Sequence, residues 1–172
     1  MGAWGPAAPG TTRRVTFPQR IERLLAEHRL EAAPFDDREI VGLWTRALTS
    51  YRDAGVAGLS EEGAFTRAYD AGRQAATTLL AAGGLRVRGQ AHHYTVFYAL
   101  AALEDPAVSQ FGVELESVRQ SRHMAVYDAT ADSAVLRSDR EKLVGMLTRL
   151  FPAAHTWLTA RRPSLGGKLR TP

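Results

Sequence analysis

Apolar residues recur at intervals of three and four along almost the whole chain, and this pattern is the strongest constraint on its fold. Such spacing places apolar side chains on one face of a helix, whereas a half-buried strand needs alternation with a period of two. No segment alternates for long enough to predict a strand. The spacing predicts helices over about residues 18–31, 37–54, 60–82, 90–104, 107–127 and 138–160. We therefore expect an all-α bundle of five to six helices.

Residues that begin, end or bend helices separate these segments. Asp36 or Asp37 is a natural N-cap for the second helix. Gly83-Gly84 is a natural end for the third, and Asp105-Pro106 breaks the chain between the fourth and the fifth. Pro152 predicts a kink or a restart in the last helix, because proline removes a helical hydrogen bond.

The third predicted helix is unusually rich in small residues. Because small side chains let another backbone approach closely, we expect this helix to lie at the centre of the bundle. The residues are Ala64, Ala68, Ala71, Gly72, Ala75 and Ala76.

The length and composition suit one ordinary domain. A chain of 172 residues with 45% hydrophobic content can bury a single core. It has no cysteine, which excludes disulfides and thiolate sites, and no apolar run approaches the ~20 residues that span a bilayer. The N-terminus lacks the features of a signal peptide. We expect a flexible tail over 1–16, a helical domain over 17–160, a cytoplasmic location and no membrane partner.

The high isoelectric point of 9.8 comes from the ends of the chain. All 18 acidic residues lie between positions 17 and 160, together with 16 of the 22 basic ones, so this body is slightly acidic. The remaining basic residues lie before and after it. We interpret residues 161–172 as a basic, solvated tail, with weak attraction to phosphate as the alternative.

One arginine falls where a core residue is expected. Phe111, Leu115 and Val118 form an apolar stripe, and Arg122 occupies the next position on it. A guanidinium stays charged, so burying it without a partner costs several kcal/mol, in roughly the range known for buried charges. Arg122 must therefore have a partner, line a cleft or lie at an interface, unless the helix has already reached solvent.

Several enzymatic signatures are missing from the sequence. It has no phosphate-binding glycine loop, no Gly-x-Ser-x-Gly elbow and no His-Glu-x-x-His pair. The five histidines show no metal-ligand spacing on any one predicted helix, although histidines from separate helices could converge on a metal. His93 lies on an apolar stripe, which favours a hydrogen-bonded core histidine. We expect neither a cofactor nor a metal.

The order of the remaining motifs points to a family. An alanine-rich helix from Gly63 to Leu80 is followed by His92-His93, a long helix and the segment Arg119-Gln-Ser-Arg122-His123-Met-Ala-Val-Tyr127. This arrangement resembles the HEPN superfamily of helical bundles, in particular its small actinobacterial members. The resemblance covers about residues 17–160.

The resemblance implies a partner and a chemistry. HEPN domains commonly form two-fold homodimers and often accompany nucleotidyltransferases in toxin–antitoxin or phage-defence pairs. Many are metal-independent endoribonucleases whose signature is an arginine, usually followed by asparagine, and a histidine four to six residues later. Arg122 matches the arginine, His123 stands where asparagine is usual, and Tyr127 stands where the catalytic histidine is expected. A surplus of large aromatics, namely Trp44, Tyr51, Phe97, Phe111 and Trp157, also favours a dimer.

The signature residues fit RNA cleavage in part. An arginine fork can hold the scissile phosphate, and a histidine can move the proton of the 2′-hydroxyl or of the leaving oxygen. The phenol of Tyr127, with an ordinary pKa near ~10, is a poor general base at neutral pH but can act as an acid or hydrogen-bond donor.

Two functions of different class follow. In the first, Arg122, His123 and Tyr127 act on RNA in a cleft at a dimer interface, with Arg119, His93 and Asp128 as further binding residues. In the second, the same cleft is non-catalytic and binds a nucleotide or a nucleotidyltransferase partner. A third and weaker hypothesis is a bundle that binds a small ligand.

Overall fold

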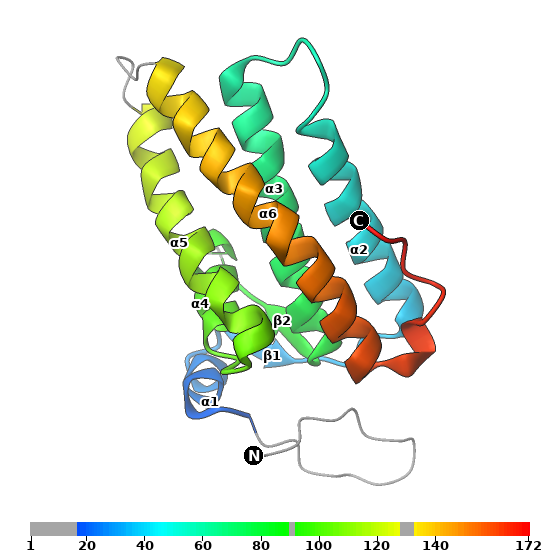
Figure 1. The fold of residues 1–172 in the computed structure, drawn as a ribbon. Helices are drawn as coiled ribbons and strands as arrows, with labels where there is room; N and C mark the ends of the chain where they lie inside the picture. The colour runs from blue at the N-terminus through cyan, green and yellow to red at the C-terminus, as the bar shows by residue number, and fades with distance from the viewer. Residues whose placement is uncertain (1–16, 90–91, 128–132) are drawn as a thin grey trace, which may run out of the picture.

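The computed structural model describes the backbone of residues 17–89, 92–127 and 133–172, and the side chains of these residues except 92, 93, 121–127, 133 and 134. The described part is a helical bundle with one small two-stranded sheet at its base (Figure 1), which confirms the predicted fold class. The elements in chain order are α1 (Gln19–Ala26), β1 (Leu30–Ala32), α2 (Asp37–Asp53), α3 (Glu61–Ala82), β2 (Leu85–Val87), α4 (His92–Ala101), α5 (Pro106–Tyr127), α6 (Ser133–Arg161) and a 3-10 turn, η1 (Pro163–Leu165).

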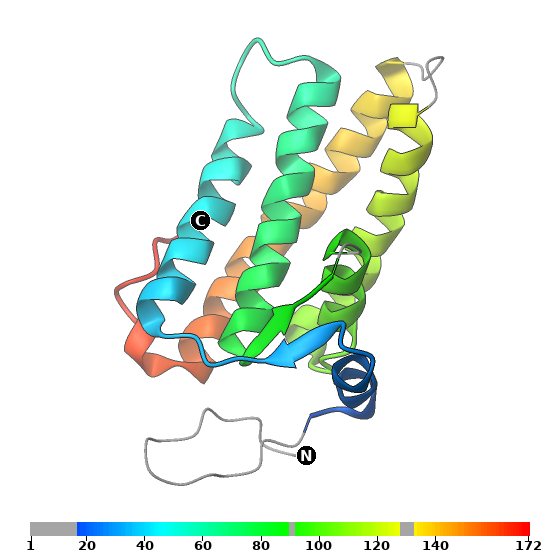
Figure 2. The ribbon, with the colours of Figure 1, turned by 180° about the vertical axis from the view of Figure 1, so that it is seen from behind.

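Helix α3 lies at the centre of the bundle, as its small residues predict. It packs against α2, α4, α5 and α6, and the view from behind shows it between its neighbours (Figure 2). Gly72 has a packing role, because a Cβ atom there would lie 2.6 Å from Leu115 Cδ2 and 3.3 Å from Leu147 Cδ2. Helices α5 and α6 therefore approach α3 closely at this glycine.

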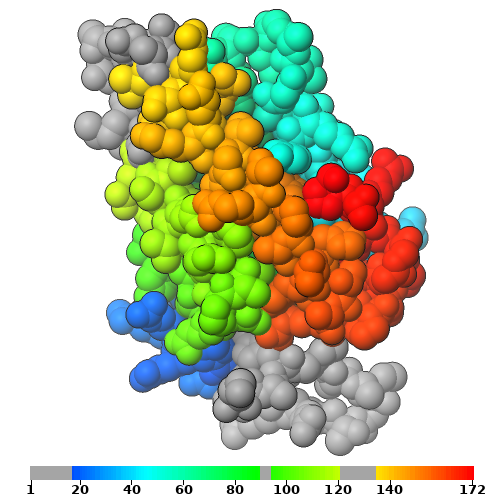
Figure 3. Space-filling view, viewed as in Figure 1, coloured from blue at the N-terminus to red at the C-terminus, as the bar shows by residue number. Residues whose placement is uncertain are grey.

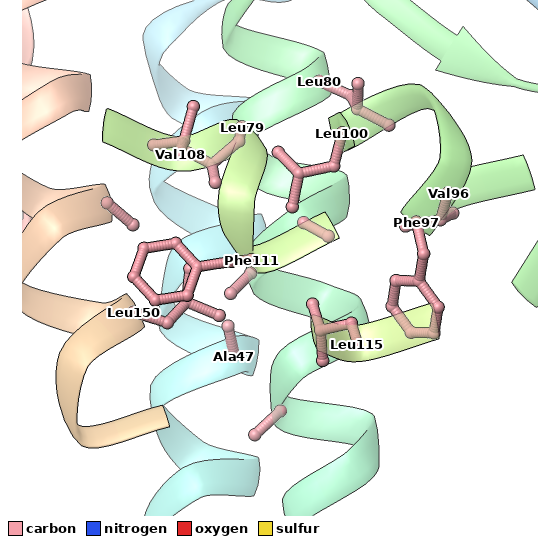
Figure 4. Close-up of a cluster of buried hydrophobic side chains, with 14 of the residues drawn as sticks. Ala47, Leu79, Leu80, Val96, Phe97, Leu100, Val108, Phe111, Leu115 and Leu150 are labelled. Carbon is pink, nitrogen blue, oxygen red and sulfur yellow. The ribbon is translucent and has the colours of Figure 1, made fainter. Parts of the chain in front are cut away.

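The predicted apolar stripes form the core. Phe97 of α4, Phe111 of α5 and Leu150 of α6 are fully or almost fully buried, and their side chains meet those of α3 in the middle of the bundle (Figure 4). Trp44 and Trp157 are buried within the same chain. Four of the five aromatics that favoured a dimer are thus buried in the core, and Tyr51 is partly buried against it.

Polar side chains cap the N-termini of α2 and α3. Asp36 caps α2 by accepting a hydrogen bond of 2.8 Å from the Glu39 amide, while the Glu39 carboxylate accepts one of 2.9 Å from the Asp36 amide. This reciprocal pair is a capping box. Ser60 caps α3 by accepting from the Gly63 amide at 3.0 Å.

The sheet corrects two predictions. The first helix ends at Ala26, not at residue 31, because His28 adopts a positive φ of 54° and the chain then enters β1. The segment after Gly84, between the third and fourth predicted helices, contains β2, although no strand was predicted; it pairs antiparallel with β1 in the register Leu30↔Val87, Glu31↔Arg86 and Ala32↔Leu85. Each strand has three residues, which is too short for a period-two pattern to be recognised.

Helix α6 excludes one of the two alternatives predicted at Pro152. It runs continuously from Ser133 to Arg161 through this residue, so the chain does not restart there. Pro152 is exposed, while Phe151 and Ala154 on the same turn are fully buried. The helical hydrogen bond that Pro152 cannot donate is therefore missing on the exposed side of α6, and the packing of the neighbouring residues holds the helix together.

The C-terminal segment also differs from expectation. Residues 161–172 were interpreted as a solvated tail, but Leu165 and Leu169 are buried. The Trp44 indole donates a hydrogen bond of 2.8 Å to the Arg170 carbonyl, and Lys168 forms a 3.0 Å ion pair with Asp37. The segment lies against α2 and α6 at the surface of the bundle (Figure 3), so most of its basic residues belong to a packed edge.

Asp105 joins α5 to α6. Its carboxylate accepts hydrogen bonds from the Ala107 amide at 3.1 Å and the Trp157 indole at 2.8 Å, and it pairs with Arg161 at 3.2 Å. We expect Asp105→Ala to lower the free energy of unfolding by about 2 kcal/mol, because it removes a helix cap and a charged acceptor. Urea denaturation measures this loss. Glu141→Ala, an exposed change on α6, serves as the control and should have little effect.

The same carboxylate makes this contribution depend on pH. Burial alone would raise the pKa of Asp105, but the hydrogen bonds from Trp157 and Ala107 and the Arg161 guanidinium hold it below its ordinary value of 3.8. A carboxyl whose pKa is lowered by folding stabilises the fold above its unfolded-state pKa and loses this effect as the pH falls through the folded-state pKa. The stability difference between Asp105→Ala and the unmutated chain should therefore shrink below about pH 3.8. A difference that stays constant down to pH 2 would contradict this account.

Candidate functional site

The predicted site residues other than Asp128 belong to α4 and α5. Helix α5 carries Arg119, Arg122, His123 and Tyr127 on one continuous helical backbone. The side chains of Arg122, His123 and Tyr127 lie outside the described part, as does the whole of Asp128. The backbone of His93 is in the first turn of α4, and its side chain is likewise outside the description.

The stripe that leads to Arg122 is confirmed as far as it is described. Phe111 and Leu115 are buried, and Val118 is half-buried and packs against the core. The face of α5 that ends in Arg122 is therefore the inner face of the bundle up to Val118. Whether Arg122 continues that burial stays a prediction.

Arg119 is the one predicted site residue whose side chain is described, and it is held in a fixed orientation. Its Nε donates to Glu116 Oε2 at 2.9 Å and its Nη2 to Glu116 Oε1 at 2.7 Å, which is a bidentate pair. The hydrogen bond with Glu116 raises the pKa of Arg119 above its ordinary value. Its guanidinium carbon lies 5.5 Å from the centre of the Tyr94 ring.

Tyr94 also contacts Arg29, a residue that is distant from it in the sequence. The guanidinium carbon of Arg29, which directly precedes β1, lies 5.2 Å from the Tyr94 ring centre and 6.0 Å from that of Tyr98. The two tyrosine rings stack with centres 5.8 Å apart. The Arg29 Nη2 atom also donates to the Thr95 hydroxyl at 3.2 Å. We call Arg29, Tyr94, Tyr98 and Arg119 the arginine–tyrosine surface.

Sequence reasoning missed this surface except for Arg119. The spacing of Tyr94 and Tyr98, four residues apart on α4, was a usable signal, because it places both rings on one face of the helix. Arg29 gave no such signal. It lies beside α4 where β1 pairs with β2, a strand that follows α2 and α3 in the chain, and the Arg88 amide donates to the Arg29 carbonyl at 2.9 Å.

The charges around the surface are mostly arranged in pairs. Glu27 is bound by Arg23 and Arg29, and Glu116 by Arg119. The hydrogen bond from Arg23 is the largest influence that lowers the pKa of Glu27, so this carboxylate stays ionised at neutral pH. Three arginines thus face two carboxylates. The resulting positive balance favours an anionic ligand, and the exposed ring of Tyr94 favours one with a planar group.

Two further findings concern metal ligands and membrane-spanning helices. Within the described residues, no three or more histidine, aspartate and glutamate side chains gather as a metal ion would need. No helix in the described part is both long and apolar enough to cross a membrane.

Comparison of the chain with protein-family models, curated proteins and solved structures found no match.

Proposed function

We propose that this chain is a HEPN-like component of a toxin–antitoxin or phage-defence pair that binds RNA or a nucleotide through the C-terminal half of α5. In this proposal Arg122 holds a phosphate, and His123 and Tyr127 shape the contact or move protons. Arg119, His93 and Asp128 complete the site. The domain acts in the cytoplasm as a homodimer, with the site at the interface between the two copies.

One observation carries the proposal furthest. The guanidinium of Arg119, one helical turn before Arg122, is fixed by Glu116 beside the exposed ring of Tyr94. An arginine and an aromatic ring at one surface are the two groups that bind the phosphate and the base of a nucleotide without reading its sequence. The all-α bundle supports the proposal too, since the resemblance implies that fold.

RNA binding and growth test the function together. Fluorescence anisotropy with a labelled 12-nucleotide single strand should show saturable binding that weakens as salt is raised, because phosphate contacts release counterions. Induced expression should arrest growth, and cleavage in the presence of EDTA would establish a metal-independent endoribonuclease. Sedimentation at micromolar concentration should give a dimer. A monomer that neither binds RNA nor slows growth would refute the proposal.

A second function has one observation in its favour. Tyr127 stands where the resemblance places a catalytic histidine, which favours a non-catalytic module. Such a module would bind RNA or a nucleotide without cleaving it and would neutralise a nucleotidyltransferase partner. Where a neighbouring gene encodes a nucleotidyltransferase, co-expression with it separates the two roles. Stable co-purification and relief of growth arrest indicate the module, whereas arrest by this chain alone indicates the effector.

A further inference from the structure

Two arginines of α6 share one carboxylate of α3 near the N-terminal ends of these helices. The Arg137 Nε atom donates a hydrogen bond to Glu61 Oε1 at 3.2 Å, and the Arg140 Nε atom lies 2.9 Å from Glu61 Oε2. The side chain of Arg137 is 60% exposed, whereas those of Arg140 and Glu61 are each 29% exposed. Arg140 is therefore the inner of the two arginines.

The forked end of the Arg140 side chain is not used within the described residues. Its Nε atom and Glu61 Oε2 are buried and form an ion pair, although their geometry is not that of a hydrogen bond. The two Nη groups of Arg140 donate no hydrogen bond to any described residue. A guanidinium that is held at Nε and open at both Nη groups presents the planar fork that binds carboxylates and phosphates.

The packing of α5 and α6 on α3 fixes how these two helices are aligned. A Cβ atom at Gly72 would meet both Leu115 of α5 and Leu147 of α6, so the two leucines lie at one level of the bundle. The 2.6 Å ion pair between Glu114 and Arg149 gives the same alignment. Because α5 and α6 run in opposite directions (Figure 1), each step back along α6 corresponds to a step forward along α5.

This alignment places Arg140 beside the segment that the proposed function assigns to phosphate. Arg140 precedes Leu147 by seven residues, and Arg122 follows Leu115 by seven residues. Seven residues make almost two helical turns, so each arginine position lies on the same face of its helix as the leucine and about 10.5 Å from it. Both leucines are fully buried. The backbone positions of Arg122 and Arg140 therefore lie at one level, on packed helices whose axes are typically about 8–10 Å apart.

We propose that Arg140 is a second phosphate-binding arginine, oriented by Glu61, beside the phosphate assigned to Arg122. This inference rests on the proposed function and adds two residues that the motif on α5 does not contain. Guanidinium forks from two helices can bind the oxygens of one phosphate group with charge-assisted hydrogen bonds. Glu61 acts as a positioning residue, because it contacts Arg140 and not the phosphate.

Salt-dependent RNA binding tests Arg140. We expect Arg140→Ala to weaken binding of a labelled single-stranded 12-mer by about 10-fold, the range for one lost charge-assisted hydrogen bond. The slope of log affinity against log salt should fall by about 0.7, the value for one contact to a single-stranded phosphate. Arg140→Lys keeps the charge without the fork, so it should recover the slope but not the full affinity. Arg137→Ala removes the same charge from the exposed partner of Glu61 and is the matched control, with an expected change below about twofold.

Glu61→Gln tests the positioning role. If charge alone mattered, removing a carboxylate near a phosphate would strengthen binding. If Glu61 orients the Arg140 fork, Glu61→Gln should instead weaken binding by about threefold or more, because the ligand must then order a freer side chain. Unchanged or tighter binding by Glu61→Gln would overturn the positioning role.

The outcomes separate this inference from the proposed function. If Arg122→Ala loses binding while Arg140→Ala binds as tightly as the unmutated chain, the inference is wrong and the proposed function stands. Equal losses in Arg140→Ala and Arg137→Ala would indicate general attraction by surface charge and also overturn it. If the unmutated chain binds no RNA at low salt, both proposals fail. Thermal melting shows whether a loss comes from unfolding, and where Arg140→Ala is unstable, full affinity of a stable Arg140→Lys would contradict a phosphate-binding fork.

Discussion

Gly112→Ala is expected to lower the free energy of unfolding by about 3 kcal/mol, at the upper end of the range for overpacked cores. Gly112 lies where the backbones of α5 and α4 pack closely together. A Cβ atom there would lie 2.7 Å from the Phe97 carbonyl oxygen and 2.9 Å from the Ala101 Cα atom. Both are backbone atoms, so the clash cannot be relieved by a side-chain rotation. The two helices must separate, and Tyr94 on α4 moves with them.

Alanine substitutions at two other glycines provide the comparison for this prediction. At Gly72 the nearest atom to a Cβ is the end of the Leu115 side chain, which can shift, so Gly72→Ala should be less destabilising than Gly112→Ala. Gly145 has nothing within 4 Å, and Gly145→Ala should stabilise helix α6 by about 0.5–1 kcal/mol. Urea denaturation of the three variants gives the order directly. Equal stability of Gly112→Ala and Gly145→Ala would contradict the packing of α4 on α5.

Arg122→Ala should weaken RNA binding about 100-fold or more and abolish growth arrest, because it removes the charged fork assigned to phosphate. The melting temperature should stay close to that of the unmutated chain. Arg122→Lys should restore little, since an ammonium cannot make the bidentate contact. Anisotropy and thermal melting on the same preparations measure both effects.

The control is an arginine away from the site. Arg52→Ala, an exposed change on α2, should leave RNA affinity nearly unchanged. If Arg122→Ala instead loses about 3–5 kcal/mol of stability, the magnitude of a broken buried ion pair, and binds RNA normally when folded, then Arg122 is a structural residue. A variant that is both stable and fully active would remove Arg122 from the site.

Features that depend on residues close together along one helix could be predicted from the sequence. Stripes such as Phe111, Leu115 and Val118 recur within two turns, so their burial could be inferred from spacing alone. Caps are equally local, and Asp36 was one of two candidates for the start of α2. Even the central position of α3 follows from a local excess of small residues.

Contacts between distant segments were not predictable in this way. The β1–β2 sheet depends on pairing across more than 50 residues, for example Glu31 with Arg86, and three-residue strands carry almost no periodic signal. Arg29, which directly precedes β1, contacts Tyr94 beside that sheet. The C-terminal segment packs because Leu165, Leu169 and the Arg170 carbonyl meet α2 and α6, which its basic composition concealed.

Photocrosslinking tests most directly whether RNA lies on α4 and α5. A single-stranded RNA containing 4-thiouridine is irradiated with the intact protein, and the crosslinked tryptic peptides are identified by mass spectrometry. Cleavage after arginine separates residues 89–119, which contain Tyr94 and Tyr98, from residues 123–137 and from the C-terminal segment. The account predicts crosslinks in 89–119, at Tyr94 or Tyr98, and in 123–137. Crosslinks confined to the basic ends, residues 1–14 and 161–172, would contradict it.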